Sequence, residues 1–128
     1  GRNFLEWLLG AIRANEDLTL FTDVRINPLS DHTIADLLVE IAERDVSDRI
    51  LHLAARNVVS KADIGRFFLE RHPSYGGHVT YTTSDALSAL AHRPKEMWLN
   101  TERAAVVFGR ELPTVEHELE RIHLNLQQ

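Results

Sequence analysis

The residues that could do chemistry are histidines, carboxylates and hydroxyl groups, because the 128-residue chain has seven histidines and no cysteine. The missing thiol excludes a cysteine nucleophile, a disulfide and a Cys-based zinc site. The best local grouping for a metal is Glu116, Glu120 and His123, which would share one helix face. A Glu-x-x-His segment builds a di-iron site only when a second helix supplies a matching set, and the sequence has no second one. We therefore expect a solvated polar face there and no metal site.

Nucleophilic and nucleotide chemistry find no support in the sequence either. His52 lies in an apolar segment without a serine or cysteine nucleophile motif, so we expect a structural histidine. Gly65 and Gly76-Gly77 lack the spacing of the glycine-rich loops that bind nucleotide phosphates. The sequence therefore predicts no catalytic residue, no cofactor and a protein that is not an enzyme.

Charge and hydropathy restrict the partners. The net charge is −5 with acids and bases interspersed, so the chain offers no broad positive field for nucleic acid. Its longest apolar runs are about five residues, far short of the roughly 20 that a membrane helix needs. We expect a cytoplasmic protein that neither binds nucleic acid nor inserts into a membrane. Because the chain begins at Gly1 without methionine, we also expect either a trimmed chain or an excised domain of a longer protein.

Regular elements must position these residues, and the apolar spacing predicts strands that alternate with helices. Strands are expected over 18–26, 49–59, 78–82 and 97–99, and helices over 3–14, 30–45, 60–72, 83–94, 101–108 and 114–126. Four helix starts share a hydroxyl residue followed by apolar residues four and seven positions later: Ser30/Ile34/Leu37, Ser60/Ile64/Phe67, Thr83/Leu87/Leu90 and Thr101/Ala105/Phe108. Repeated strand-cap-helix units predict an α/β fold with a mainly parallel sheet and helices packed on it.

The first and last helices lie outside these repeats, and residues 1–128 are expected to form a single domain. The apolar stripes of the two terminal helices can pack on the sheet, or they can bind another copy of the chain or a neighbouring domain. Both alternatives remain open, so a homo-oligomer through the terminal helices is one possible assembly.

Several segments within about residues 20–108 follow one another in an order that resembles the STAS domain family, the fold of sulfate transporters and anti-sigma-factor antagonists. They are Val24-Arg25-Ile26-Asn27-Pro28-Leu29-Ser30, Arg49-Ile50-Leu51-His52-Leu53, Asn57-Val58-Val59-Ser60-Lys61-Ala62-Asp63-Ile64-Gly65, Gly77-His78-Val79-Thr80-Tyr81, Ser84-Asp85-Ala86-Leu87 and Trp98-Leu99-Asn100-Thr101-Glu102-Arg103-Ala104-Ala105. The resemblance implies a STAS-like core at 20–108 with extra terminal helices.

The resemblance also implies a non-catalytic regulatory domain that binds a protein partner through the start of the second core helix. Members of the family that act as phosphorylation switches carry Asp-Ser at this start, where this chain has Ser60 and Lys61. A lysine at the phosphate-acceptor position implies a constitutive binding surface instead of a switch. We expect the partner to contact Ser60, Lys61, Asp63 and Ser30.

The alternative function is a small-ligand or lipid-binding module. Its pocket would lie between sheet and helices, near Phe21, Phe67, Phe68 and Tyr81. Two further alternatives have less support: the negative charge disfavours a helical DNA-binding module, and the uneven spacing of the helix starts disfavours a leucine-rich repeat.

Overall fold

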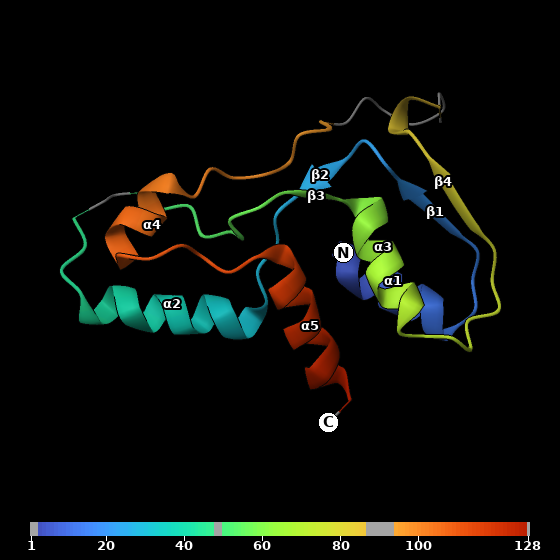
Figure 1. Cartoon of the computed structure of the whole chain (residues 1–128), viewed down its shortest axis with the longest axis horizontal. Helices are drawn as coiled ribbons and strands as arrows, with labels where there is room; N and C mark the ends of the chain where they lie inside the picture. The colour runs from blue at the N-terminus through green and yellow to red at the C-terminus, as the bar shows by residue number, and fades with distance from the viewer. Residues whose placement is uncertain (1–2, 48–49, 87–93, 128) are drawn as a thin grey trace. The chain divides into compact units, whose positions relative to one another are not determined.

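A computed structural model of the chain describes residues 3–47, 50–86 and 94–127 (Figure 1). The chain divides into two compact units. The first unit comprises residues 1–25 and 59–96, and the second comprises residues 26–58 and 97–128. Whether residues 1–128 behave as a single domain stays a prediction.

The first unit opens with helix α1 (Phe4–Arg13), as the apolar spacing predicts. The side chain of Asn3 accepts a hydrogen bond from the backbone N–H of Glu6 and caps the helix start. One face of α1 is buried, namely Leu8, Leu9, Ala11 and Ile12. This face contacts helix α3 of the same unit, so the stripe of the N-terminal helix is covered within the chain.

The sheet of the first unit pairs β1 (Leu18–Phe21) with β4 (Val79–Thr82) in parallel, from Leu18 opposite Val79 to Phe21 opposite Thr82. In β1, Leu18 and Leu20 are buried and Thr19 is exposed, which is the alternation of a strand with one covered face. Helix α3 (Lys61–Glu70) covers β1. A Cβ at Gly65 of α3 would collide with the side chain of Leu20, so glycine permits this close packing.

Three further elements are short. Strands β2 (Arg25–Ile26) and β3 (Val59–Ser60) form a second two-stranded sheet, and a 3₁₀ turn η1 (Ser84–Ala86) follows β4. Arg25 also forms an isolated parallel bridge with Glu96. The expectation of an α/β fold with a parallel sheet is therefore confirmed, although the sheets are small.

The second unit consists of helices α2 (Asp31–Glu43), α4 (Glu102–Phe108) and α5 (Val115–Leu126) with the segments between them. Its apolar core is a cluster of buried side chains, Leu37, Ala104, Phe108 and Leu112, packed against Leu29, Ile41, Leu51 and Leu53. Outside this core, Arg110 donates two hydrogen bonds to the carboxylate of Glu40, at 3.0 and 2.6 Å. This pair connects α2 to the segment after α4 and lowers the pKa of Glu40.

A buried carboxylate joins α5 to the start of α2. Glu118 of α5 is fully buried, and it accepts hydrogen bonds from the backbone N–H of Ser30 (2.8 Å) and the hydroxyl of Thr33 (2.9 Å). In a capping box the third helical residue supplies such a carboxylate to the N-cap. That position of α2 is Thr33, so Glu118 supplies the missing acid from another helix.

Two predicted strands are wrong. Residues 50–56 and 97–100 have no regular structure, and at Ala55 and Leu99 the backbone is bound by the side chain of Asn27. The amide of buried Asn27 donates to the carbonyls of Ala55 (3.0 Å) and Leu99 (2.8 Å) and accepts from the N–H of Leu99 (3.0 Å). A single amide therefore replaces the ladder that a strand would need.

The helices expected at 3–14, 30–45, 60–72, 101–108 and 114–126 are confirmed to within two residues at each end. The strand expected over 18–26 is interrupted by a bend at residues 22–23. Of the helix expected over 83–94, Ser84–Ala86 form the 3₁₀ turn η1, and residues 87–93 lie outside the described residues. Across 3–47, 50–86 and 94–127, no helix is both long and apolar enough to cross a membrane, and the cytoplasmic location stays a prediction.

Candidate functional site

The parallel pair β1 and β4 ends in polar residues. Asp23 follows β1 and Ser84 follows β4. The pairing of Phe21 with Thr82 places the carboxyl ends of the two strands side by side. In α/β proteins ligands bind outside the carboxyl ends of parallel strands, because loops there carry variable side chains on a rigid support. This edge of the first unit is therefore the candidate functional site, and we call it the carboxyl edge.

Asp23 is the centre of the carboxyl edge. One of its carboxylate oxygens accepts the backbone N–H of Ser84 and the other accepts the Ser84 hydroxyl, both at 2.8 Å. The Nζ of Lys95 lies 3.6 Å from the same carboxylate. Burial by itself would raise the pKa of Asp23, but the hydrogen bonds from Ser84 and the charge of Lys95 lower it below its usual value. The carboxylate is thus held in its charged form.

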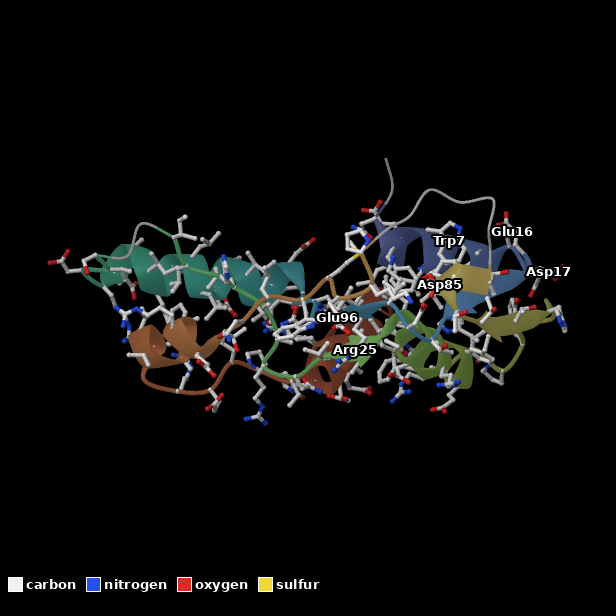
Figure 2. All side chains as sticks on the ribbon, turned by 90° about the horizontal axis from the view of Figure 1, so that it is seen from above. Trp7, Glu16, Asp17, Arg25, Asp85 and Glu96 are labelled. Carbon is white, nitrogen blue, oxygen red and sulfur yellow. The ribbon has the colours of Figure 1, made fainter. Side chains whose placement is uncertain are left out.

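Two cations accompany Asp23 at this edge. Lys95 forms an ion pair with Asp85, and this hydrogen bond, together with the charges of Asp85 and Asp23, raises the pKa of the Lys95 ammonium. Arg25 lies 3.6 Å from Glu96, and its backbone N–H donates to the carbonyl of Lys95 at 2.8 Å. Figure 2 shows Arg25 and Glu96 beside each other at one end of the unit.

The opposite edge of the same strands, at their amino ends, is held together by hydrogen bonds. The hydroxyl of Tyr75 donates to the carbonyl of Glu16 (2.7 Å), and the carboxylate of Asp17 accepts the N–H of His78 (3.0 Å). A Cβ on Gly77 would lie 2.7 Å from the Glu16 carbonyl oxygen. Figure 2 shows Glu16 and Asp17 at the far end from Arg25 and Glu96. These hydrogen bonds join the two strands at this edge, which leaves the carboxyl edge as the candidate site.

The predicted partner residues of the first unit build a helix start. Ser60 and Asp63 form a complete capping box, with hydrogen bonds of 3.0 Å in both directions. Lys61, the first residue of α3, lies with its Nζ 5.0 Å from the centre of the Phe4 ring. These contacts explain why α3 begins here, and a role of Ser60, Lys61 and Asp63 in binding a partner stays a prediction.

Ser30 belongs to the second unit and is buried. It caps α2 through a 3.2 Å hydrogen bond from the N–H of Thr33, and its own N–H is bound by Glu118. Its expected role as a partner contact likewise stays a prediction.

The four predicted ligand-binding aromatics are divided between buried and open positions. Phe68 is fully buried in the first unit and packs edge-on against Phe67 with ring centres 5.2 Å apart. Phe67 and Tyr81 are each covered by an arginine, Arg71 at 3.5 Å and Arg66 at 4.4 Å from the ring centres. Phe21 is half-buried at the end of β1. A ligand at these residues stays a prediction.

Sequence reasoning missed Asp23, Ser84, Lys95 and the amide of Asn27. The signal for Ser84 was present, because it follows the strand predicted over 78–82, and such strand ends carry ligand-binding loops. Asp23 lies inside the strand predicted over 18–26, so its place at a strand end was not visible in the sequence. The hydroxyl pattern at helix starts marks helix caps instead: Ser30 and Ser60 cap α2 and α3 through their side chains, whereas Thr101 precedes α4 without a side-chain cap hydrogen bond. Asn27 and Lys95 carried no signal, since their partners are distant in the sequence.

Comparisons with solved structures define the class of fold. The chain resembles a dTDP-4-dehydrorhamnose reductase of Clostridium acetobutylicum, with a TM-score of 0.80, 19% identity and coverage of 100% of this chain and 45% of that chain. A Bacillus anthracis dTDP-4-dehydrorhamnose reductase in complex with NADP gives a TM-score of 0.79 and 16% identity over 98% of this chain and 44% of that one. The fold is therefore one found within reductases.

The particular family follows from the sequence. The model of the RmlD substrate binding domain matches residues 1–128, and the chain belongs to this family. A curated relative is 27% identical over 119 residues, 91% of this chain and 38% of its own length: a protein of Haloferax volcanii described as a probable low-salt glycan biosynthesis reductase. The chain thus spans less than half the length of the relatives it matches.

These findings correct the predicted identity. The STAS resemblance is wrong, because strand-cap-helix order is shared by many α/β proteins while the RmlD model matches the whole chain. The expectations of a non-catalytic regulatory signalling domain and of a protein that is not an enzyme are wrong as well, since the chain matches the RmlD substrate binding domain and its relatives are named as reductases.

The described residues do not fit a dinucleotide cofactor. Among the described residues, the strand-to-helix junctions β2–α2 (27–30) and β3–α3 (60–61) contain no glycine, although a dinucleotide site needs glycines where a strand turns into its helix. Within the parts of the chain that are described, no group of three or more His, Asp or Glu side chains could hold a metal ion.

Proposed function

We propose that the chain is the substrate-binding part of a reductase that acts on a nucleotide-linked keto sugar in glycan biosynthesis. The observation that carries this proposal is the match of the RmlD substrate binding domain to residues 1–128. The solved relatives are named for reducing dTDP-4-dehydrorhamnose, which carries a ketone on a sugar attached to a nucleoside diphosphate. Reduction of that ketone to an alcohol requires a hydride and a proton.

The division of labour in this proposal follows from the chain's own residues. The carboxyl edge offers charged and polar groups suited to a polar substrate, and the junctions lack a glycine-rich turn. The nicotinamide cofactor that supplies the hydride would therefore be held by a part of the reductase outside this chain. In this division, the chain binds and orients the sugar nucleotide.

The test is an activity measurement on the product of the complete gene. Purified protein is mixed with NADPH and dTDP-4-dehydrorhamnose, and NADPH oxidation is followed together with the appearance of a reduced sugar nucleotide by mass spectrometry. We expect turnover that depends on both compounds. NADPH consumption without a reduced sugar nucleotide, or no turnover with any of several keto-sugar nucleotides, would contradict the proposal.

A further inference from the structure

Lys95 at the carboxyl edge is held by two acids that differ in how firmly they are fixed. Asp23 is anchored by two hydrogen bonds to Ser84, and its side chain is only 19% exposed. Asp85 lies on the three-residue turn η1, and its side chain is 63% exposed. Asp23 is therefore a permanent neighbour of Lys95, whereas Asp85 is a solvent-accessible one.

The contact between Lys95 and Asp85 can be exchanged. An ion pair with one partner so exposed contributes little to stability, because water solvates both charges well when they separate. The diphosphate of a sugar nucleotide carries two negative charges, against one for a carboxylate, and presents several acceptor oxygens to an ammonium group. A diphosphate that reaches Lys95 would therefore replace Asp85 more readily than Asp23.

We propose that Lys95 binds the diphosphate of the nucleotide-linked substrate and that Asp85 takes the place of this diphosphate when substrate is absent. The proposal rests on the proposed function, because the substrate class comes from there. Asp23 is a positioning residue in this arrangement: it holds the Lys95 ammonium at the edge while the outer partner changes.

The surroundings of Lys95 support a multiply charged anion. The backbone N–H of Arg25 in β2 donates to the carbonyl of Lys95 at 2.8 Å, so a residue with a second cationic side chain lies next to Lys95. The Arg25 side chain is 48% exposed and its ion pair with Glu96 is 3.6 Å long, so this cation is also accessible. Asp23 and Asp85 both raise the pKa of Lys95, which keeps the ammonium charged at neutral and alkaline pH.

The experiment measures equilibrium binding of dTDP to the complete gene product by calorimetric titration. We expect Lys95→Met to weaken binding about tenfold, because a charge-assisted hydrogen bond is lost. We expect Asp85→Asn to strengthen binding about threefold, because the competing carboxylate is removed. Asp17→Asn is the matched control: it makes the same change of charge at the opposite edge, where asparagine can still accept the N–H of His78. Its affinity should equal that of the wild type.

Three results would overturn the proposal: no binding of dTDP to the wild type, unchanged binding in Lys95→Met, or equal effects of Asp85→Asn and Asp17→Asn. If Lys95→Met does not fold, Asp85→Asn decides the matter by itself, and Lys95→Arg should keep most of the affinity. Reductase activity is measured separately on the same preparations. The predicted binding pattern without turnover would contradict only the proposed reaction, and turnover without the pattern would contradict only the role of Lys95.

Discussion

At the scale of residues, Glu118 illustrates how a carboxylate becomes part of an apolar unit. It is fully buried in the second unit, and both oxygens are used by the start of α2. Arg121 donates to the hydroxyl of Thr33 at 2.8 Å, so a cation lies one hydrogen bond away from the carboxylate. The burial of this carboxylate is tolerated because hydrogen-bond donors of the protein replace the water that would otherwise solvate it.

Replacement of Glu118 by alanine should therefore be strongly destabilising. The change leaves the N–H of Ser30 and the hydroxyl of Thr33 without their acceptor in a buried place, for which we expect a loss of about 2–4 kcal/mol in the free energy of unfolding. Urea denaturation followed by circular dichroism measures it. Glu111→Ala, at an exposed position, is the control and should change stability by less than about 0.5 kcal/mol. Equal losses in the two variants would contradict the assigned role.

Asp23 should make the stability of the fold depend on pH in the acidic range. Its pKa in the folded chain lies below the usual value of 3.8, so its contribution to stability is present above the unfolded-state pKa and is lost as the pH falls through the folded-state pKa. We expect Asp23→Asn to be less stable than wild type at neutral pH, with the difference shrinking below about pH 4. Melting temperatures across a pH series measure this. Curves that stay parallel down to pH 3 or so would show that Asp23 is not responsible.

At the scale of elements, the helices were predictable and several strands were not. Helix starts such as Ser60 with Asp63 are encoded within four residues, so sequence alone finds them. The segments at 50–56 and 97–100 are apolar enough to predict strands, yet Ala55 and Leu99 in them are bound by the side chain of Asn27. This choice depends on residues 28 and 72 positions apart, which no local pattern contains.

The packing of α3 on β1 depends on Gly65. An alanine there adds a Cβ that collides with the side chain of Leu20, whose Cδ2 would be 3.1 Å away. Alanine normally favours a helix interior over glycine by about 1 kcal/mol, but overpacking of a buried contact costs about 1–3 kcal/mol. We expect a net loss of stability in Gly65→Ala, measured by chemical denaturation. Gly76→Ala, where a Cβ meets only Asn15 at 3.8 Å, should be close to neutral. A stabilised Gly65→Ala would show that α3 lies further from β1.

At the scale of the whole molecule, the family assignment changes what the chain is expected to do by itself. It covers 38% of the length of the Haloferax volcanii relative and 44–45% of two solved reductases. Composition, charge and periodicity correctly indicated an α/β protein with a parallel sheet. They could not distinguish one α/β family from another, because the positions shared among such families are mostly apolar ones that any sheet and helix require.

We expect the 128-residue chain alone to bind no NADP, since its strand junctions lack the glycine turn of dinucleotide sites. Quenching or enhancement of NADPH fluorescence measures binding, and the product of the complete gene is the positive comparison. A dissociation constant in the micromolar range for the isolated chain would contradict the division of labour between substrate and cofactor. Equally weak binding by the complete gene product would instead count against the reductase function.

The amide of Asn27 has a consequence for the chemical ageing of the protein. Deamidation would convert a group that donates to the carbonyls of Ala55 and Leu99 into a carboxylate that faces them with like partial charge. The usual route requires the N–H of the next residue to attack the side-chain amide, and the next residue is Pro28, whose nitrogen carries no hydrogen. Asn27, which binds two segments of the second unit, is thus followed by the one amino acid that closes the usual route of its deamidation.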